Sequence, residues 1–153
     1  MNSKWIEKVG LAVLDGERLL VVRKRGGRLF ILPGGKPEGA ETATQTLVRE
    51  LDEELGCKVD APHLLGTFMD KAAGNDDAVV VVRLYGGSLV GEPVPQAEIE
   101  EAAWVNIRRP TSLPLAPSIL NFILPYLRKQ ANRTSRLPAD ANVQPAQGLL
   151  HLL

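Results

Sequence analysis

The chain has little that would commit it to a nucleic-acid polymer, an acidic membrane or a disulfide framework. Its 153 residues carry 18 Lys and Arg against 18 Asp and Glu, so the formal net charge is zero. A neutral chain has no general electrostatic attraction for nucleic acid or acidic lipid. The single cysteine, Cys57, has no partner within the chain for a disulfide and favours a reducing compartment.

Long apolar runs are also scarce. The longest, "AVVVV" at residues 78–82, is far shorter than the ~20 residues that a membrane-spanning helix needs. The first residues, "MNSKWIEKVG", lack the apolar region of a signal peptide. The sequence therefore predicts a soluble, cytoplasmic protein with one domain long enough to bury a core, and with neither a membrane nor a nucleic-acid polymer as partner.

The hydrophobic pattern predicts hairpins combined with two helices. Strands are expected at residues 9–14, 18–25, 28–32, 63–70, 77–87 and 102–107. Helices are expected at 42–55 and 116–130, the second bent or interrupted by Pro125. This mixture indicates an α+β fold, a mixed β-sheet with helices on its faces.

The domain is expected to span residues 1–130, followed by a C-terminal segment at 131–153. That segment is a polar linker ending in the apolar "GLLHLL" at 148–153. Leaving four leucines in water is costly, since burying one Leu is worth roughly 1.5–3 kcal/mol. We therefore expect the tail to dock in an apolar groove on its own or a partner subunit, the latter arrangement giving a homodimer.

The helix predicted at residues 42–55 has clear ends. Thr42 begins it as an N-cap, with Gln45 completing a capping box, and Gly56 follows its last turn. The residues expected to form its buried stripe recur at helical spacing: Leu47, Val48, Leu51 and Leu55.

The same helix crowds negative charge into its C-terminal half. Glu50, Glu53 and Glu54 fall on one arc roughly 100° wide. Anions at this end of the helix dipole are disfavoured by about 0.3–1 kcal/mol, and like-charged neighbours add some tenths of a kcal/mol. Such consistent local conflict indicates a functional reason, and a bound metal cation is the obvious compensation.

The stretch "GKPEGAETATQTLVRELDEELGC" at residues 35–57 resembles the Nudix box. That box is a Gly, five residues, a Glu, seven residues, and then Arg-Glu-apolar-any-Glu-Glu-any-Gly-apolar. Cys57 is a mild departure, because an aliphatic residue is usual there. The matching positions in this sequence are Gly35, Glu41, Arg49, Glu50, Leu51, Glu53, Glu54, Gly56 and Cys57.

The resemblance implies a Nudix-like α/β/α sandwich that hydrolyses a nucleoside diphosphate linked to another group, with Mg²⁺ or Mn²⁺. Carboxylates on one arc suit such a hard cation, which takes oxygen ligands from protein, water and phosphate. The implied metal ligands are Glu50, Glu53, Glu54 and the Gly34 carbonyl. Glu41 and Arg49 are implied supports of those ligands.

The general base stays open at this point. In the family it comes from the box or from a later loop, so the catalytic candidates are Glu50 and Glu53 in the box and Glu98 or Glu101 in "QAEIEEAAWV". The plain alternative for the later glutamates is a solvated turn before a strand.

Three basic residues are candidates for phosphate binding. Arg23 and Arg25 share one strand face, and Lys36 directly follows the two glycines. Ordinary exposed charge explains each of them equally well. The nucleotide itself is not identified, because loops outside the box select it. A sensor that binds nucleotides without cleaving them is the main alternative function, and an isomerase acting on diphosphate esters is a weaker one.

Overall fold

A computed structural model of the chain describes residues 4–72, 74–109 and 111–135. The tail at 148–153 and its expected docking lie outside these residues. Before the first helix come the strands β1 (Lys4–Ala12), β2 (Leu14–Asp15), β3 (Arg18–Lys24) and β4 (Gly34–Gly35). Then follow α1 (Ala43–Leu55), β5 (Lys58–Ala72), β6 (Asn75–Val90), β7 (Ile99–Asn106), the π-helical turn η1 (Ile119–Ile123) and α2 (Leu124–Ser135).

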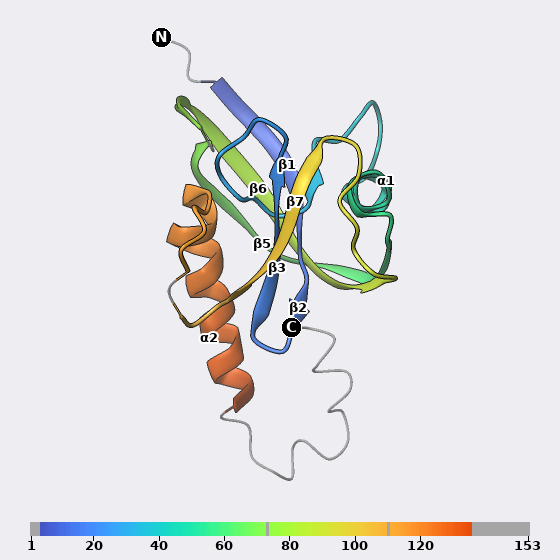
Figure 1. Cartoon of the computed structure of the whole chain (residues 1–153). Coiled ribbons are helices and arrows are strands. Elements are labelled where there is room, and N and C mark those ends of the chain that lie inside the picture. The colour runs from blue at the N-terminus through green and yellow to red at the C-terminus, as the bar shows by residue number, and fades with distance from the viewer. Residues whose placement is uncertain (1–3, 73, 110, 136–153) are drawn as a thin grey trace.

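The strands form two sheets, which lie between α1 on one side and α2 on the other (Figure 1). One sheet has the order β4-β1-β6-β5, with β1 parallel to β6 and the other pairs antiparallel. The second is antiparallel, in the order β2-β3-β7. The expected α+β fold with helices on its faces is confirmed, although the strands divide between two sheets.

Alternation along the strands creates a core on each side. In β1, Val9 and Leu11 pack with the α1 leucines Leu47, Leu51 and Leu55. The opposite face carries Ala12, which belongs to a second cluster with residues of η1 and α2. Because successive strand residues point to opposite faces, one strand contributes to both cores.

Several predicted bounds need correction. Residues 28–32 form only isolated bridges, between Val22 and Ile31 and between Phe30 and Leu115. The strands β1, β5 and β6 are longer than the hydrophobic pattern indicated. Helix α2 continues to Ser135, so residues 131–135 of the predicted linker are helical.

Pro125 does not interrupt the C-terminal helix. The irregularity precedes it as η1, where the Leu124 amide donates to the Ile119 carbonyl five residues back. Among the described residues, no helix is long and apolar enough to cross a membrane.

Candidate active site

Helix α1 begins and ends as its sequence predicts. Thr42 and Gln45 form both hydrogen bonds of the capping box, and Gly56 ends the helix in the left-handed conformation, at φ 67°. The predicted buried stripe was wrong at Val48, which is 48% exposed. Thr46 and Glu54 are buried instead, so a carboxylate occupies part of the face that packs on the strands.

A glycine pair brings the backbone of β4 against the glutamates of α1. A Cβ on Gly34 would lie 2.0 Å from the Val9 carbonyl oxygen, and one on Gly35 would lie 1.8 Å from Oε2 of Glu50. The Gly34 amide donates to Oε1 of Glu54 over 3.0 Å. Only glycine permits this approach, because any side chain would displace the Glu50 carboxylate or the β1 backbone.

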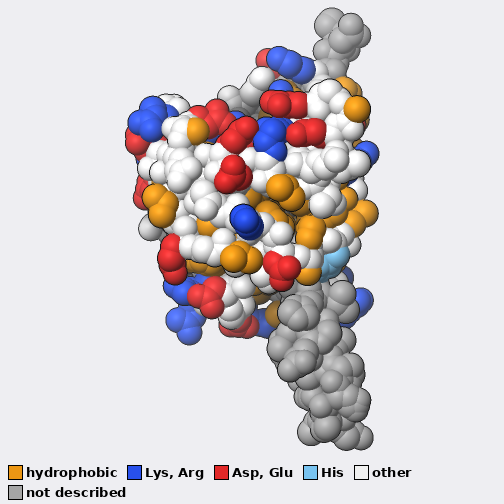
Figure 2. All heavy atoms as spheres, turned by 90° about the vertical axis from the view of Figure 1, so that its right-hand side faces the viewer, with side chains coloured by type: hydrophobic (Ala, Val, Ile, Leu, Met, Phe, Trp, Pro, Cys, Tyr) orange, Lys and Arg blue, Asp and Glu red, His pale blue; other side chains and the backbone are white. Residues whose placement is uncertain are grey.

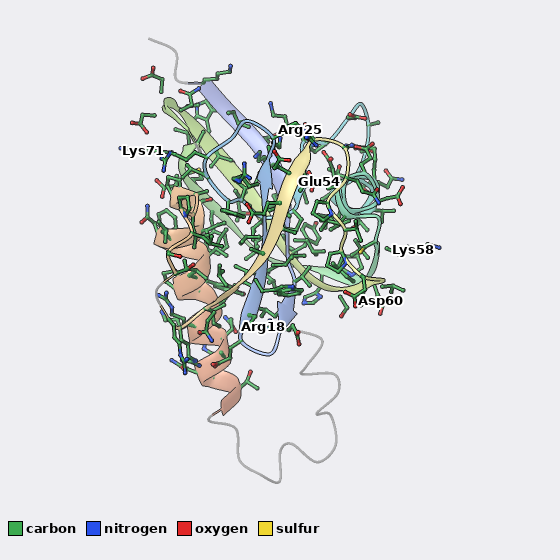
Figure 3. The ribbon with its side chains drawn as sticks, viewed as in Figure 1. Arg18, Arg25, Glu54, Lys58, Asp60 and Lys71 are labelled. Carbon is green, nitrogen blue, oxygen red and sulfur yellow. The ribbon has the colours of Figure 1, made fainter. Side chains whose placement is uncertain are left out.

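Glu54 is the most unusual charged group of the site. It is 2% exposed and comes from α1 toward the strands (Figure 3). Burial raises its pKa to about 8, opposed by the Gly34 hydrogen bond and reinforced by Glu50. The pKa of Glu50 is also raised, first by burial, against the lowering effect of Arg49. A cation placed between these two carboxylates would stabilise the ionised form of both and so lower both pKa values.

Arg49 holds the flank of the site. Its Nε and Nη2 donate to the two carboxylate oxygens of Glu41 over 2.7 and 2.9 Å. Nη2 also donates to the Lys36 carbonyl, which ties α1 to the glycine loop. Hydrogen bonds from Arg49 lower the pKa of Glu41 to about 2, so this pair is ionised and bidentate at neutral pH.

Glu53 stands apart from the other two glutamates of the arc. Its side chain is 53% exposed and its Oε2 lies 3.5 Å from Nη1 of Arg49. Across the described residues, no group of three or more His, Cys, Asp or Glu side chains is already gathered as a metal cage. Glu50, Glu54 and the close backbone still fit a hard divalent cation, because Mg²⁺ takes one or two carboxylates and completes its shell with water and phosphate.

A second group of glutamates lies where β7 begins. We call Glu98, Glu100 and Glu101 the β7 glutamates, and Glu50, Glu53 and Glu54 the α1 glutamates. Each β7 glutamate pairs with a cation of the neighbouring β3 segment, at 3.7, 3.4 and 3.2 Å. The pairs are Lys24–Glu98, Arg25–Glu100 and Arg23–Glu101. Figure 2 shows the α1 side of the molecule, where acidic side chains gather around basic ones in the upper part.

The loop before β7 is fastened to the end of α1. The Val94 amide donates to the Leu55 carbonyl over 3.0 Å, and the Gln96 amide to the Glu54 carbonyl over 2.8 Å. Glu98 is thereby held close enough to contribute to the raised pKa of both Glu50 and Glu54. Among the later glutamates, the structure thus brings Glu98 to the α1 glutamates, while Glu101 lies against Arg23 on β3.

The arginines predicted to meet phosphate are engaged elsewhere. Arg23 also donates to the Gly27 carbonyl, and Arg25 to the Ala97 carbonyl. Lys24, the residue between them, lies close enough to the α1 glutamates for its charge to lower the pKa of Glu50 and Glu54. Period-two alternation showed that these three side chains divide between two faces, but only the sheet pairing decides which face carries the site.

Lys8 of β1 is a functional candidate that the sequence did not suggest. It is half-buried, and burial lowers its pKa, followed by the charge of Lys24. Glu54, Lys36 and Glu50 also act on this ammonium. Nothing in the local pattern "IEKVG" distinguishes Lys8 from an exposed strand lysine, since its neighbours come from β3, α1 and the glycine loop.

An apolar pocket opens beside the glycine pair. Its cavity volume is about 40 Å³, and it opens to solvent. Gly34, Gly35 and Lys8 form its side toward the α1 glutamates. Its remaining lining is Val9, Gly10, Ile31, Leu32, Val80, Val82, Ala116, Ser118, Ile119 and Ile123. The site thus joins a cation-accepting acidic edge to an apolar cavity.

The family model described as NUDIX domain matches residues 5–124, which include the carboxylates, the glycine pair and the pocket. The chain belongs to the Nudix hydrolase family. Nudix hydrolases generally need a divalent metal, which agrees with the all-oxygen donors found here. The chain is 27% identical over 127 residues to an uncharacterized Nudix hydrolase of Bacillus subtilis, covering 78% of this chain and 80% of that protein.

Other relatives carry more specific names. The chain is 33% identical over 133 residues to the oxidized purine nucleoside triphosphate hydrolase of Danio rerio, covering 84% and 83% of the two proteins. Among solved structures, a putative Nudix hydrolase of Chromobacterium violaceum matches with a TM-score of 0.65 at 24% identity. That match covers 98% of this chain and 94% of the other, and shows the common fold.

Proposed function

We propose that this Nudix hydrolase cleaves nucleoside triphosphates, with oxidised purine nucleotides among its substrates. The observation that carries the proposal is Glu54, a buried carboxylate held by the Gly34 amide, which itself lines an apolar pocket. The name of the Danio rerio relative supports the substrate class. The intact α1 glutamates favour turnover over a sensor that only binds.

The metal assigned to this site is Mg²⁺ or Mn²⁺. Glu50, Glu54 and the Gly34 carbonyl would hold it, with Glu53 contributing from the same helix. When bound, the cation supplies neutralisation of the phosphate charge and activation of water. Gly35 leaves room for the Glu50 carboxylate, and the bidentate Glu41–Arg49 pair fixes the helix against the glycine loop.

Among the candidate bases we assign Glu98. Its loop is hydrogen-bonded to the end of α1, so its carboxylate has a fixed place beside the ligands while staying 58% exposed to water. In the proposed step Glu98 takes a proton from a water molecule, and the oxygen of that water forms a bond to phosphorus. The phosphoric anhydride bond breaks, and its bridging oxygen leaves with the departing phosphate group.

The basic residues divide between two roles. The charges of Lys24 and Lys36 act on Lys8 together with those of Glu50 and Glu54, and these two lysines would bind substrate phosphates as point charges. Arg23 and Arg25, whose guanidiniums are occupied by Glu101 and Glu100, we assign to holding β7 against β3.

A nucleotide panel tests the proposal. Purified protein with Mg²⁺ or Mn²⁺ is assayed against ordinary and oxidised nucleoside triphosphates and ADP-ribose, and released phosphate and pyrophosphate are measured. We expect turnover of triphosphates that stops with excess chelator, returns with Mg²⁺ or Mn²⁺, and is poorly supported by Ca²⁺, whose looser shell misplaces the water. Binding without turnover would instead indicate a sensor, and full turnover in excess chelator would contradict the metal mechanism.

A further inference from the structure

Lys8 lies at a junction of three strands. In β1 it pairs with Val82 of β6, and the next residue, Val9, pairs with Gly35 of β4. Its side chain lines the apolar pocket together with Gly34 and Gly35. It also lines a second hollow, bounded by Lys24, Gly27, Arg28, Leu29, Ile31 and Gly74. Lys8 therefore stands where the pocket, the glycine pair and the basic end of β3 meet.

The Lys8 ammonium is half-buried among charged groups. Within residues 4–72, 74–109 and 111–135 it makes neither a hydrogen bond nor an ion pair. The nearby carboxylates of Glu50 and Glu54 act on it through space without forming an ion pair. A half-buried cation without a partner carries a desolvation cost that a bound anion would offset.

We infer that Lys8 is a substrate-contacting residue whose ammonium binds the phosphate joined to the nucleoside. This inference rests on the proposed function. In the proposed function the α1 glutamates hold the hydrolysed phosphates on one side of Lys8, and the apolar lining on its other side suits a base. The group that connects these two parts of a nucleotide is the nucleoside phosphate, and Lys8 lines the passage between the two places.

The charges around Lys8 favour a phosphate contact over a contact to the base. The groups that act on its ammonium are Lys24, Glu54, Lys36 and Glu50, all on the phosphate side. The far lining of the pocket is apolar apart from Ser118, so no charge there draws the lysine inward. An ammonium at the phosphate end would also distinguish nucleotides from nucleosides, which the apolar lining alone does not do.

The test measures dissociation constants by calorimetry with Mg²⁺ present. The probes are the nucleoside and its 5′-monophosphate, with the base of the triphosphate that the wild type hydrolyses best. We expect Lys8→Met to weaken monophosphate binding by about tenfold to a hundredfold, the range for losing a charged hydrogen bond, and to leave nucleoside binding unchanged. Lys8→Arg, which keeps the charge, should restore most of the monophosphate affinity.

Lys4→Met is the matched control, since Lys4 lies on the same face of β1, about 13 Å away, and is exposed. It should bind both probes as the wild type does. Monophosphate binding unchanged in Lys8→Met would overturn the inference, and an equal loss for nucleoside and monophosphate would assign Lys8 to the base instead. If the wild type hydrolyses no nucleotide, the proposed function fails, whereas normal hydrolysis with an unaffected Lys8→Met removes only this inference. Circular dichroism of each variant separates loss of binding from loss of fold.

Discussion

Two groups of three glutamates lie close together in this molecule and differ in what surrounds them. Each β7 glutamate pairs with its own cation from β3 and is about half exposed. Of the α1 glutamates, Glu54 is buried, and its one hydrogen bond within the described part of the chain comes from a backbone amide. Glu50 and Glu53 share Arg49 at 3.5 Å. Burial without an ion-pair partner therefore marks Glu54 as the carboxylate most in need of a cation.

The largest expected effect comes from neutralising the α1 glutamates. Glu53→Gln and Glu54→Gln should each lower kcat by on the order of 10² or more, because each removes an anionic group proposed to hold the metal. Glu100→Gln is the control, since Glu100 pairs with Arg25 at the surface. Kinetics of the three variants with Mg²⁺ check this. Equal losses in all three would erase the distinction between the two groups.

A second comparison lies within the β7 glutamates. Glu98→Gln should lower kcat by about 10², the low end for loss of a general base, with KM little changed. Glu101→Gln should have a small effect, because Glu101 faces Arg23 on the second sheet. Steady-state kinetics of the pair decide between the two candidates. A reversed ranking would move the base to Glu101, and two small effects would return it to Glu53.

The smallest expected effect is on stability without metal. The pKa of Glu54 is about 8 in the fold against 4.5 for an ordinary glutamate, so between these values the folded state holds a proton that the unfolded state has released. The free energy of unfolding should therefore fall as the pH rises from about 4.5 to about 8. In Glu54→Gln this contribution to the decline should disappear.

Urea melts in chelator across that pH range measure the decline. Glu100→Gln should keep the wild-type slope, since it leaves Glu54 in place. Added Mg²⁺ should stabilise the wild type more than Glu54→Gln, because a ligand stabilises the state that binds it. If the free energy of unfolding without metal is clearly lower for Glu54→Gln than for the wild type, this carboxylate is a structural partner.

Local sequence determined the features that depend on neighbours along the chain. Thr42, Gln45 and Gly56 set the ends of α1 because capping needs only residues within a turn. The spacing of the α1 glutamates and of the glycine pair was likewise readable, together with the family that it resembles. Strand alternation gave the general α+β class, although short apolar runs left the bounds of β1, β5, β6 and α2 inexact.

Tertiary structure decided which charges meet. Val48 is exposed and Glu54 is buried because β1 and β4 pack against the face of α1 that carries Glu54. The helix sequence alone does not show from which direction these strands approach. Lys24, and neither Arg23 nor Arg25, acts on Glu50 and Glu54, since the packing of β3 in the fold sets which of its side chains lie near α1. Lys8 and Glu98 lie outside the Nudix box in sequence. Sheet pairing brings Lys8 beside the box, and the loop fastened to α1 brings Glu98 there. Their charges act on the box because charge interactions depend on distance in space and not along the chain.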